Sequence, residues 1–513
     1  MPSNKVKHMI GQMLMFGVKG YTFTEEMRTM IASFDMGGFI YFKRNVQNAK
    51  QVFTLNKAIQ AYAKTPLFIG IDQEGGLVTA IDDITPTPGA MATAAAKDYL
   101  ADYKTVTKYA GTALKSLGIS INFAPNGDIN NNPDNPVINA RSYGDTKEMV
   151  SLYTTAMIES FESARLISTI KHFPGHGDTN VDSHLGLPTI HLTLEKMDQF
   201  ELVPFKNAIK NGVPAIMTAH ILVPALDAMH PATLSKRILK ELCRDQLNFN
   251  GLLITDLLSM HAIKDHYSLK DTIMHAVNAS NDILLYDAPT LEGYHQFVET
   301  FYACVDEDLI KESTIEAAYK RIMHAKETYH VGLMDASFEV IESSLMPNDI
   351  KCLSEKITKA SMTMVKGTIS KIDFKKTLVI FPNISIYSLI DTYHNRQQTF
   401  KDYLSDLKID TAQILLSEHL DEANIQMILK ESKNYNHIVV FTYNSFMYPQ
   451  QQRLMHLLDE VNVIWVSLRA PYDGIHIKKG TYLCAYEATK QSFKAIYETL
   501  NGDEANGTLP VKI

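Results

Sequence analysis

Residues 166–173 read Leu166-Ile-Ser-Thr-Ile-Lys-His-Phe173, an apolar stretch that ends in a lysine and a histidine. Similar short apolar runs recur through the first two thirds of the chain, separated by longer stretches with helix-like spacing of apolar residues, such as 98–116, 147–164 and 194–210. Strands that alternate with helices predict an α/β fold, here a (β/α)8 TIM barrel. A doubly wound open sheet has the same alternation and is the alternative. The predicted strands are Met13–Val18, Gly37–Phe42, Leu67–Asp72, Ile121–Pro125, Leu166–Phe173, Ala215–Ile221, Leu253–Leu258 and Asp282–Tyr286.

Polar side chains recur where these predicted strands end. A barrel enzyme builds its active site from several strands at the C-terminal end of the barrel, so charged groups at the ends of apolar strands indicate such a site. One of them alone could be a solvated strand end, but their repetition favours the barrel over the open sheet. The residues are Asp72, Asp128, Lys171, His172, His220 and, within the seventh run, Asp256.

The composition changes after the eighth run. Residues 331–349 carry Gly, Pro and Asn and have the character of a linker. Beyond them, apolar runs again alternate with helical stretches, which predicts a smaller αβα sandwich domain with a parallel sheet. We therefore divide the chain into a barrel domain (1–335), a linker (336–350) and a C-terminal domain (351–513). The predicted strands of this second domain are Thr377–Phe381, His437–Thr442, Val461–Leu468 and Thr481–Tyr486.

The bulk composition argues against several classes of protein. The chain has 513 residues, 45% of them hydrophobic, and a formal net charge of −8 without a basic run, so we expect no nucleic-acid partner. No apolar stretch reaches the roughly 20 residues that span a bilayer. Lys5 and Lys7 precede the apolar run 9–18, but Gln12 interrupts it and no cleavage site follows. The four cysteines are scattered and suggest no disulfide framework, which fits a reducing compartment. The sequence therefore predicts a cytoplasmic protein without a membrane partner. We expect it to be a monomer or a small homo-oligomer.

The segment Lys171-His-Phe-Pro-Gly-His-Gly-Asp-Thr-Asn-Val-Asp-Ser-His184 packs three histidines and two aspartates into one irregular loop. One interpretation of this segment is a metal site formed by its histidines. Metal-binding histidine pairs usually lie one turn apart on a helix, and Pro174 and Gly175 exclude a helix here. We therefore expect neither a metal nor a cofactor.

The second interpretation of the segment is a site of acid/base catalysis. Asp182 and His184 are two residues apart and project to the same side of an extended chain. A carboxylate beside an imidazole orients the ring and favours its protonated form, which suits proton transfer near neutral pH. The alternative is a structural histidine with satisfied hydrogen bonds, but the position in a Gly-rich loop after a strand favours catalysis.

Three further charged residues extend the candidate site. Asp256 interrupts an otherwise apolar strand, where a carboxylate is costly unless it is paired or functional. It suits a nucleophile at the end of the barrel, although it could also only anchor the loop. Asp72 could accept hydrogen bonds from sugar hydroxyls, and the guanidinium of Arg141 could bind a carbonyl, a hydroxyl or an anion.

Together these segments resemble glycoside hydrolase family 3, in particular its β-N-acetylglucosaminidase branch. The resemblance covers the whole predicted barrel in order, and its most specific part is the string 171–184. The residues after the linker resemble the αβα sandwich domain of two-domain members. The matching strings are Ile71-Asp-Gln-Glu-Gly-Gly76, Asn135-Pro-Val-Ile with Arg141-Ser142, Lys171-His-Phe-Pro-Gly-His-Gly-Asp-Thr with Asp182-Ser-His184, Met217-Thr-Ala-His220, Pro231-Ala-Thr-Leu-Ser235, Thr255-Asp256 and Val466-Ser-Leu-Arg-Ala-Pro-Tyr-Asp473.

The resemblance implies a retaining exo-β-N-acetylglucosaminidase that acts on small carbohydrates such as cell-wall fragments. It implies Asp256 as the nucleophile that forms a glycosyl-enzyme, and His184, supported by Asp182, as the acid/base. Most glycosidases use a carboxylic acid in that second role. The residues that it implies for binding the sugar are Asp72, Arg141, Lys171 and His172, with His220 near the cavity.

Two departures from the family pattern concern substrate binding. Ala80 stands where the family usually has a sugar-contacting arginine, and Asn126-Gly127 replaces a more apolar pair.

Two alternative functions stay open. One is a phosphorylase on the same fold, because a neutral histidine repels phosphate less than a carboxylate does. The other is a non-catalytic sugar-binding protein, suggested by Ala80 and disfavoured by the complete catalytic set.

Overall fold

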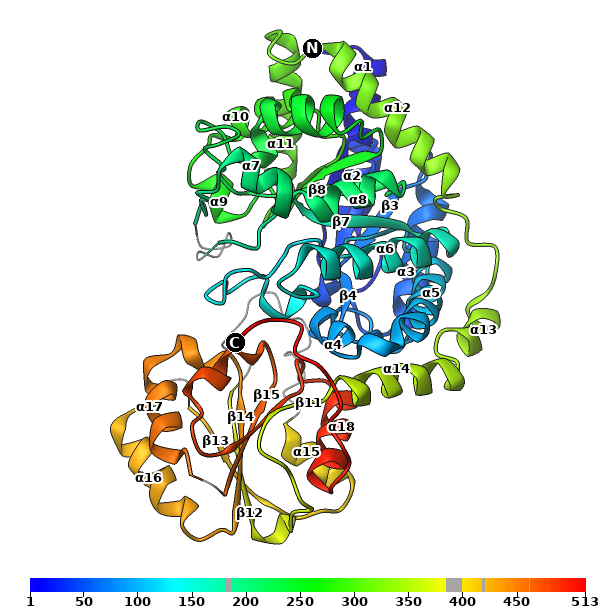
Figure 1. The fold of residues 1–513 in the computed structure, drawn as a ribbon. Helices are drawn as coiled ribbons and strands as arrows, with labels where there is room; N and C mark the ends of the chain where they lie inside the picture. The colour runs from blue at the N-terminus through cyan, green and yellow to red at the C-terminus, as the bar shows by residue number, and fades with distance from the viewer. Residues whose placement is uncertain (180–185, 384–398, 418–419, 461) are drawn as a thin grey trace.

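The computed structural model describes residues 1–179, 186–383, 399–417, 420–460 and 462–513, and these form a larger and a smaller body (Figure 1). The larger body contains a parallel sheet in the order β10-β1-β2-β3-β6-β7-β8-β9. Its strands are β1 (Leu14–Gly17), β2 (Gly38–Tyr41), β3 (Phe68–Ile71), β6 (Ile121–Asn122), β7 (Ile167–Phe173), β8 (Ala215–Thr218), β9 (Leu252–Thr255) and β10 (Leu284–Tyr286).

The two ends of this sheet meet. Ile254 of β9 forms a parallel bridge with Ile283, which directly precedes β10, and the backbone N–H of Thr255 donates to the Ile283 carbonyl at 3.0 Å. The sheet is therefore a nearly closed barrel, which confirms the predicted fold and rules out the open sheet. Each strand overlaps its predicted run and is shorter than it. β9 begins one residue before its run, at Leu252, and ends at Thr255, so that Asp256 follows the strand instead of lying inside it.

Helices surround the barrel and bury one face against it (Figure 1). Their starts follow capping chemistry: at α6, for example, the Thr146 side chain accepts a hydrogen bond from the Met149 backbone N–H. The main helices are α1 (Asn4–Gln12), α2 (Glu25–Phe34), α3 (Ala49–Tyr62), α5 (Leu100–Ser116), α6 (Lys147–Ser163), α8 (Val203–Lys210), the π-helix η6 (Arg237–Gln246), α10 (Leu269–Asn278), α11 (Leu291–Asp306) and α12 (Glu312–Thr328).

Short elements lie at the strand ends and between the two bodies. A two-stranded hairpin, β4 and β5, follows β3, and α13 and η7 lie in the predicted linker. The domain boundaries at 335 and 351 stay a prediction. These short elements are β4 (Gln73–Gly75), β5 (Val78–Thr79), α4 (Ala90–Ala95), η3 (Asn139–Arg141), α7 (Leu194–Lys196), η4 (Met197–Glu201), η5 (Ala232–Leu234), α9 (His261–Lys264), α13 (Phe338–Ile341) and η7 (Glu342–Ser344).

The smaller body is an αβα sandwich. Alternate residues of its central strands face opposite sides: Ile438 and Val440 pack with α16 and α17, whereas Val439 and Phe441 pack with α15 and α18. Figure 1 shows the two helix pairs on either side of the sheet. The sheet order is β11-β16-β15-β14-β12-β13. The elements are α14 (Asn348–Ser361), β11 (Thr363–Lys366), β12 (Thr377–Phe381), α15 (Phe400–Asp406), β13 (Ala412–Leu415), α16 (Glu422–Ser432), β14 (His437–Thr442), α17 (Pro449–Leu458), β15 (Val463–Ser467), β16 (Thr481–Cys484) and α18 (Lys490–Leu500).

Two edge strands of this sheet were not predicted. β11 is antiparallel to β16, so the expectation of a purely parallel sheet is wrong at that edge, while the other pairs are parallel. β13 pairs with β12 at the other edge, and its residues are exposed or half-buried. Edge strands face solvent and lack the continuous apolar run that identifies a buried strand.

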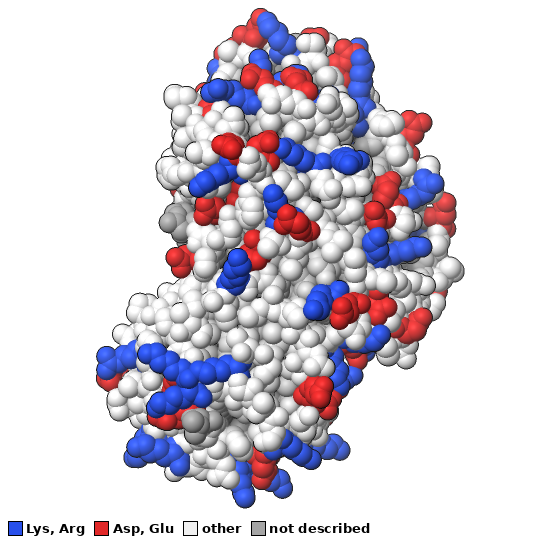
Figure 2. Space-filling model, viewed as in Figure 1, with Lys and Arg blue, Asp and Glu red and all other residues white. Residues whose placement is uncertain are grey.

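The surface carries no simple charge pattern on the face that Figure 2 shows. Basic and acidic side chains are mixed over both bodies, with a run of basic side chains on the smaller one. In the part of the chain that the structure describes, no helix combines the length and the apolar character that crossing a bilayer requires.

Candidate active site

Charged and polar residues from four barrel strands lie at the same end of the barrel. Asp72 directly follows β3, Lys171 and His172 lie in β7, His220 follows β8 by two residues, and Asp256 directly follows β9. Because the strands are parallel, all of these positions belong to the C-terminal end, as the sequence predicted.

Lys171 connects two carboxylates. Its buried ammonium lies 2.6 Å from Oδ1 of Asp72 and 2.6 Å from Oε1 of Glu74. Burial alone would lower the pKa of Lys171, but the charges of Asp72 and Glu74 outweigh it and raise the pKa above its ordinary value. Lys171 therefore stays charged, and the Asp72 carboxylate, whose side chain is 30% exposed, is held at the edge of the site.

Glu74 also forms a bidentate ion pair with Arg141. Nε of Arg141 lies 3.0 Å from Oε2 and Nη2 lies 2.6 Å from Oε1, and both side chains are buried. Although burial opposes it, the cations Arg141 and Lys171 lower the pKa of Glu74 to about 2. Glu74 is missing from the predicted site. The available signal was a second acid in the string Asp72-Gln-Glu74, two residues beyond the strand.

Asp128 holds the loop that contains His172 and His176. Its Oδ2 lies 2.7 Å from Nδ1 of His172, and its Oδ1 accepts the backbone N–H groups of His172 at 3.1 Å and His176 at 2.7 Å. Burial opposes ionisation, but these partners lower the pKa of Asp128. The contact fixes the His172 ring and leaves its Nε2 for a second partner. Asp128 was noted at a strand end but was not predicted as a site residue.

Asp256 lies where β8 and β9 end. Its backbone N–H donates to the Thr218 carbonyl at 3.2 Å, and its Oδ1 accepts the Leu257 backbone N–H at 2.7 Å. The side chain is half-buried. Burial lowers the pKa of the His176 imidazole to about 4, although the nearby charges of Asp128 and Asp256 act in the opposite direction. Asp256 after β9 and the His172–His176 loop at the end of β7 therefore lie at the same end of the barrel.

His220 is buried behind this region. Nδ1 lies 2.9 Å from Oγ1 of Thr233, and Nε2 lies 3.0 Å from the Leu257 carbonyl. Both ring nitrogens thus contact the protein, and His220 holds the residue that follows Asp256. Its predicted contact with the sugar stays a prediction.

Asp182 and His184, the predicted acid/base pair, lie outside the described residues. The described part of their loop ends at Thr179, whose Oγ1 lies 2.9 Å from Nδ1 of His176. With Nδ1 of His172 bonded to Asp128 and Nδ1 of His176 bonded to Thr179, both histidines are held by the protein. Among the described residues, no group of three His, Cys, Asp or Glu side chains has an arrangement that could hold a metal ion.

Ala80, which stands where the family usually has an arginine, is buried. Ala80 donates its backbone N–H to Oε1 of Gln73 at 2.9 Å, and its carbonyl accepts the ammonium of Lys43 at 2.7 Å. Lys43 follows β2 and also pairs with Asp82 at 2.6 Å. A cation that follows the neighbouring strand β2 therefore contacts the backbone of Ala80, the position at which the family pattern has an arginine. Sequence reasoning missed Lys43, since nothing in the linear order connects it to Ala80.

A barrel whose C-terminal end holds several carboxylates, an arginine and histidines defines a class, the barrel enzymes that act on polar small molecules. The model of the glycosyl hydrolase family 3 N-terminal domain matches residues 5–325. The chain belongs to this family.

Individual relatives support this result. β-Hexosaminidase A from Pseudoalteromonas piscicida is 36% identical over 372 residues, which cover 67% of this chain and 62% of that protein, less than two thirds of its length. A β-hexosaminidase from Xanthomonas oryzae pv. oryzae is 30% identical over 54% of this chain and 84% of that protein. The structure of a family 3 β-N-acetylglucosaminidase from Paenibacillus sp. str. FPU-7 is 34% identical, with a TM-score of 0.92 over 100% of this chain and 99% of that one.

Proposed function

We propose that the chain is a retaining exo-β-N-acetylglucosaminidase that releases N-acetylglucosamine from small β-linked glycosides such as cell-wall fragments. The observation that carries this proposal is the placement of the Asp256 carboxylate at the barrel end that also holds the Asp72–Lys171 pair and His172. The similarity over its whole length to a family 3 β-N-acetylglucosaminidase supports the choice of sugar.

The proposed reaction has two steps. Asp256 attacks the anomeric carbon while His184, oriented by Asp182, protonates the leaving oxygen. The same histidine then removes a proton from water, which attacks the glycosyl-enzyme and restores the configuration. The bond from the Leu257 N–H to Oδ1 orients the carboxylate of Asp256. Asp72, Arg141, Lys171 and His172 bind the hydroxyls of the sugar.

The first test is hydrolysis of a chromogenic β-N-acetylglucosaminide. We expect Asp256→Ala to lower kcat at least about 1000-fold, which corresponds to roughly 4 kcal/mol of lost transition-state stabilisation. Asp265→Ala, which removes an exposed aspartate paired with His261, is the matched control and should keep full activity. Equal turnover by the Asp256→Ala variant and the parent chain would disprove the nucleophile.

A second measurement separates hydrolysis from phosphorolysis, which the sequence leaves open. Proton NMR of the first product from a defined disaccharide, with and without phosphate, reports the stereochemistry and the acceptor together. We expect the β-anomer of the free sugar in both cases. Release of the sugar 1-phosphate would replace the hydrolase by a phosphorylase, and binding without turnover would indicate a sugar-binding protein.

A further inference from the structure

The C-terminal domain contacts the barrel through loops that follow β15 and β16. Tyr472 accepts a hydrogen bond from Nδ2 of Asn130 at 2.9 Å, and the Ala470 N–H donates to Oδ1 of Asn139 at 3.3 Å. Both partners belong to the barrel segment that ends at Arg141. A third contact, that of Glu487, reaches Gly89 and the turn of the hairpin at Gly76. The domain interface therefore lies directly behind residues of the candidate site.

Glu487 is almost fully buried, with 1% of its surface exposed. Its Oε2 accepts the backbone N–H of Gly89 at 2.8 Å, and its Oε1 accepts the hydroxyl of Thr489 at 3.2 Å. A Cβ atom at Gly76 would lie 2.4 Å from Oε2, and one at Gly89 would lie 3.0 Å from it. The carboxylate is therefore seated against two glycines that have no side chain to keep it away.

Gly76 lies in the turn between β4 and β5, and Gly89 directly precedes α4. The Gly76 N–H donates to the Thr87 carbonyl at 2.8 Å, next to the chain that leads to Gly89. Gly76 directly follows β4, and β4 contains Glu74, whose carboxylate holds both Arg141 and Lys171. Glu487 thus accepts a hydrogen bond from Gly89 and lies against Gly76, two residues beyond Glu74 at the centre of this ion network.

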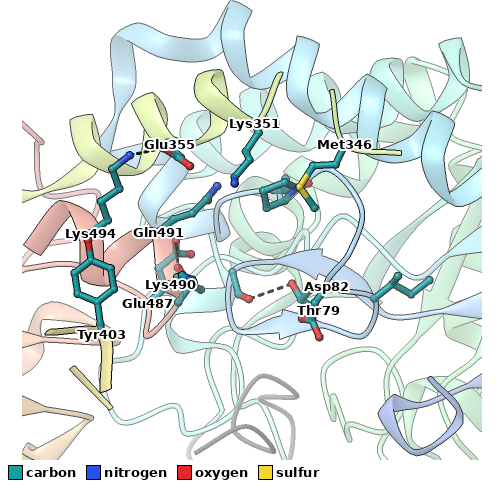
Figure 3. A pocket seen from close by; sticks show the side chains of 15 residues that line it. Thr79, Asp82, Met346, Lys351, Glu355, Tyr403, Glu487, Lys490, Gln491 and Lys494 are labelled. Carbon is teal, nitrogen blue, oxygen red and sulfur yellow. Dashed lines mark hydrogen bonds and ion pairs between the residues drawn. The ribbon is translucent and has the colours of Figure 1, made fainter. Parts of the chain in front are cut away.

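The hairpin also borders empty space between the two bodies. A cavity of about 420 Å³ lies between the two bodies, lined by Thr79 and Asp82 of the barrel and by Tyr403, Lys490 and Glu487 of the C-terminal domain (Figure 3). A smaller cavity of about 20 Å³ is lined by Glu74, Arg141 and Glu487 among others. Empty space supplies no packing contacts on this side, so the contact of Glu487 adds to the support that the hairpin receives from Leu77, which packs in an apolar core cluster of the C-terminal domain.

We propose that Glu487 is a positioning residue of the active site. By fixing Gly76 and Gly89 it places β4, so that Glu74 holds Arg141 and Lys171 where they bind the sugar. The C-terminal domain is in this way part of the substrate-binding site, although Glu487 itself does not touch the substrate. The proposal rests on the proposed function, in which Arg141 and Lys171 bind the sugar.

The test compares substitutions of Glu487 in the full chain. Glu487→Ala removes the acceptor, and we expect it to raise KM about tenfold with kcat within about threefold, because misplaced binding groups weaken substrate binding first. Glu487→Gln keeps an oxygen that accepts the Gly89 N–H and should restore KM to within about twofold. Glu498→Ala, which removes a partly exposed partner of Lys359 on the same domain, is the control.

Gly89→Ala supplies a second variant in case Glu487→Ala does not fold. Its new Cβ presses on Oε2 of Glu487, so it should raise KM severalfold in the parent chain, yet have no effect in the Glu487→Ala background. Unchanged KM in folded Glu487→Ala and Gly89→Ala would overturn the inference. A parent chain without glycosidase activity would instead overturn the proposed function.

Discussion

At the residue scale, the site depends on buried charges that satisfy one another. Glu74 receives two cations, and Asp128 receives an imidazole and two backbone N–H groups. A buried ion is costly unless its partners are complete, so each member of such a network depends on the others. This dependence makes the network rigid, and it makes the loss of one member more serious than the loss of a surface ion pair.

Removal of the Glu74 carboxylate should therefore be strongly destabilising. In Glu74→Ala, Arg141 and Lys171 stay buried without their shared partner, and we expect the free energy of unfolding to fall by about 3–5 kcal/mol. Glu159→Ala, which breaks an exposed pair with Lys104, should cost less than about 1 kcal/mol. Urea denaturation of both variants measures the difference, and similar losses would contradict the argument.

Glu201 gives a prediction for pH. It is fully buried and accepts a hydrogen bond from Asn131 at 2.7 Å, and burial, with Asp128 and Asp178 nearby, raises its pKa from 4.5 to about 8. Between about pH 4.5 and pH 8, Glu201 therefore keeps a proton in the folded state that it loses in the unfolded state. This contribution to stability is complete below about pH 4.5 and is lost as the pH rises towards about 8.

The substitution Glu201→Gln removes this titration and keeps an oxygen for Asn131. We expect the Tm of the variant, relative to the parent chain, to increase between pH 5 and pH 9 in a thermal melting series. The exposed Glu195→Gln on the preceding helix should show a constant difference. A constant difference for Glu201→Gln as well would mean that Glu201 ionises normally.

At the element scale, the loop after β7 is held by close backbone contacts. A Cβ at Gly177 would lie 1.7 Å from the Ile129 carbonyl oxygen, and Nδ2 of Asn135 donates to the carbonyls of His176 and Gly177 at 2.9 and 2.8 Å. This loop leads into the segment that contains Asp182 and His184. Its position is therefore set by the neighbouring loop after β6 and not by its own residues alone.

The substitution Gly177→Ala should displace this loop. The backbone at Ile129 cannot yield as a flexible side chain would, so we expect kcat/KM to fall at least about tenfold. Gly212→Ala is the control, because nothing lies within 4 Å of its Cβ, and only its φ of +75° opposes the change. Steady-state kinetics and melting curves of both variants check this, and full activity in Gly177→Ala would refute the role of the contact.

At the scale of the whole molecule, the last residues of the chain return to the barrel (Figure 1). The Thr508 N–H donates to the Ala95 carbonyl at 3.0 Å, the Asp145 N–H donates to the Pro510 carbonyl at 3.2 Å, and the Lys512 N–H donates to Oδ2 of Asp145 at 2.8 Å. The segment 508–512 therefore ties the smaller domain to the barrel, next to the contacts of Tyr472 and Glu487.

Deletion of residues 508–513 should weaken this connection. We expect differential scanning calorimetry to show the barrel transition lowered by on the order of 5 °C, because several backbone hydrogen bonds between the domains are lost. Deletion of Ile513 alone, whose side chain is exposed, should leave the transition unchanged. An unchanged transition in the longer deletion would show that the tail does not couple the domains.

Much of the fold and part of the site could be predicted from the sequence. Buried parallel strands are continuous apolar runs, so all eight barrel strands were found, and the charged residues at their ends pointed to the site. The edge strands β11 and β13 were missed because solvent exposure removes that pattern. Helix starts at capping residues such as Thr146 depend on local chemistry alone.

The sequence by itself determined the barrel, the sandwich and the positions of Asp72 and Lys171 at strand ends, because these follow from local hydrophobic patterns and chain order. Only the tertiary structure decided that Glu74 joins Arg141 to Lys171, that Lys43 lies beside Ala80, and that Glu487 contacts the hairpin. The physical reason is distance along the chain: Glu487 and Gly89 are separated by 398 residues, and no local pattern records a contact that forms only when two domains pack together.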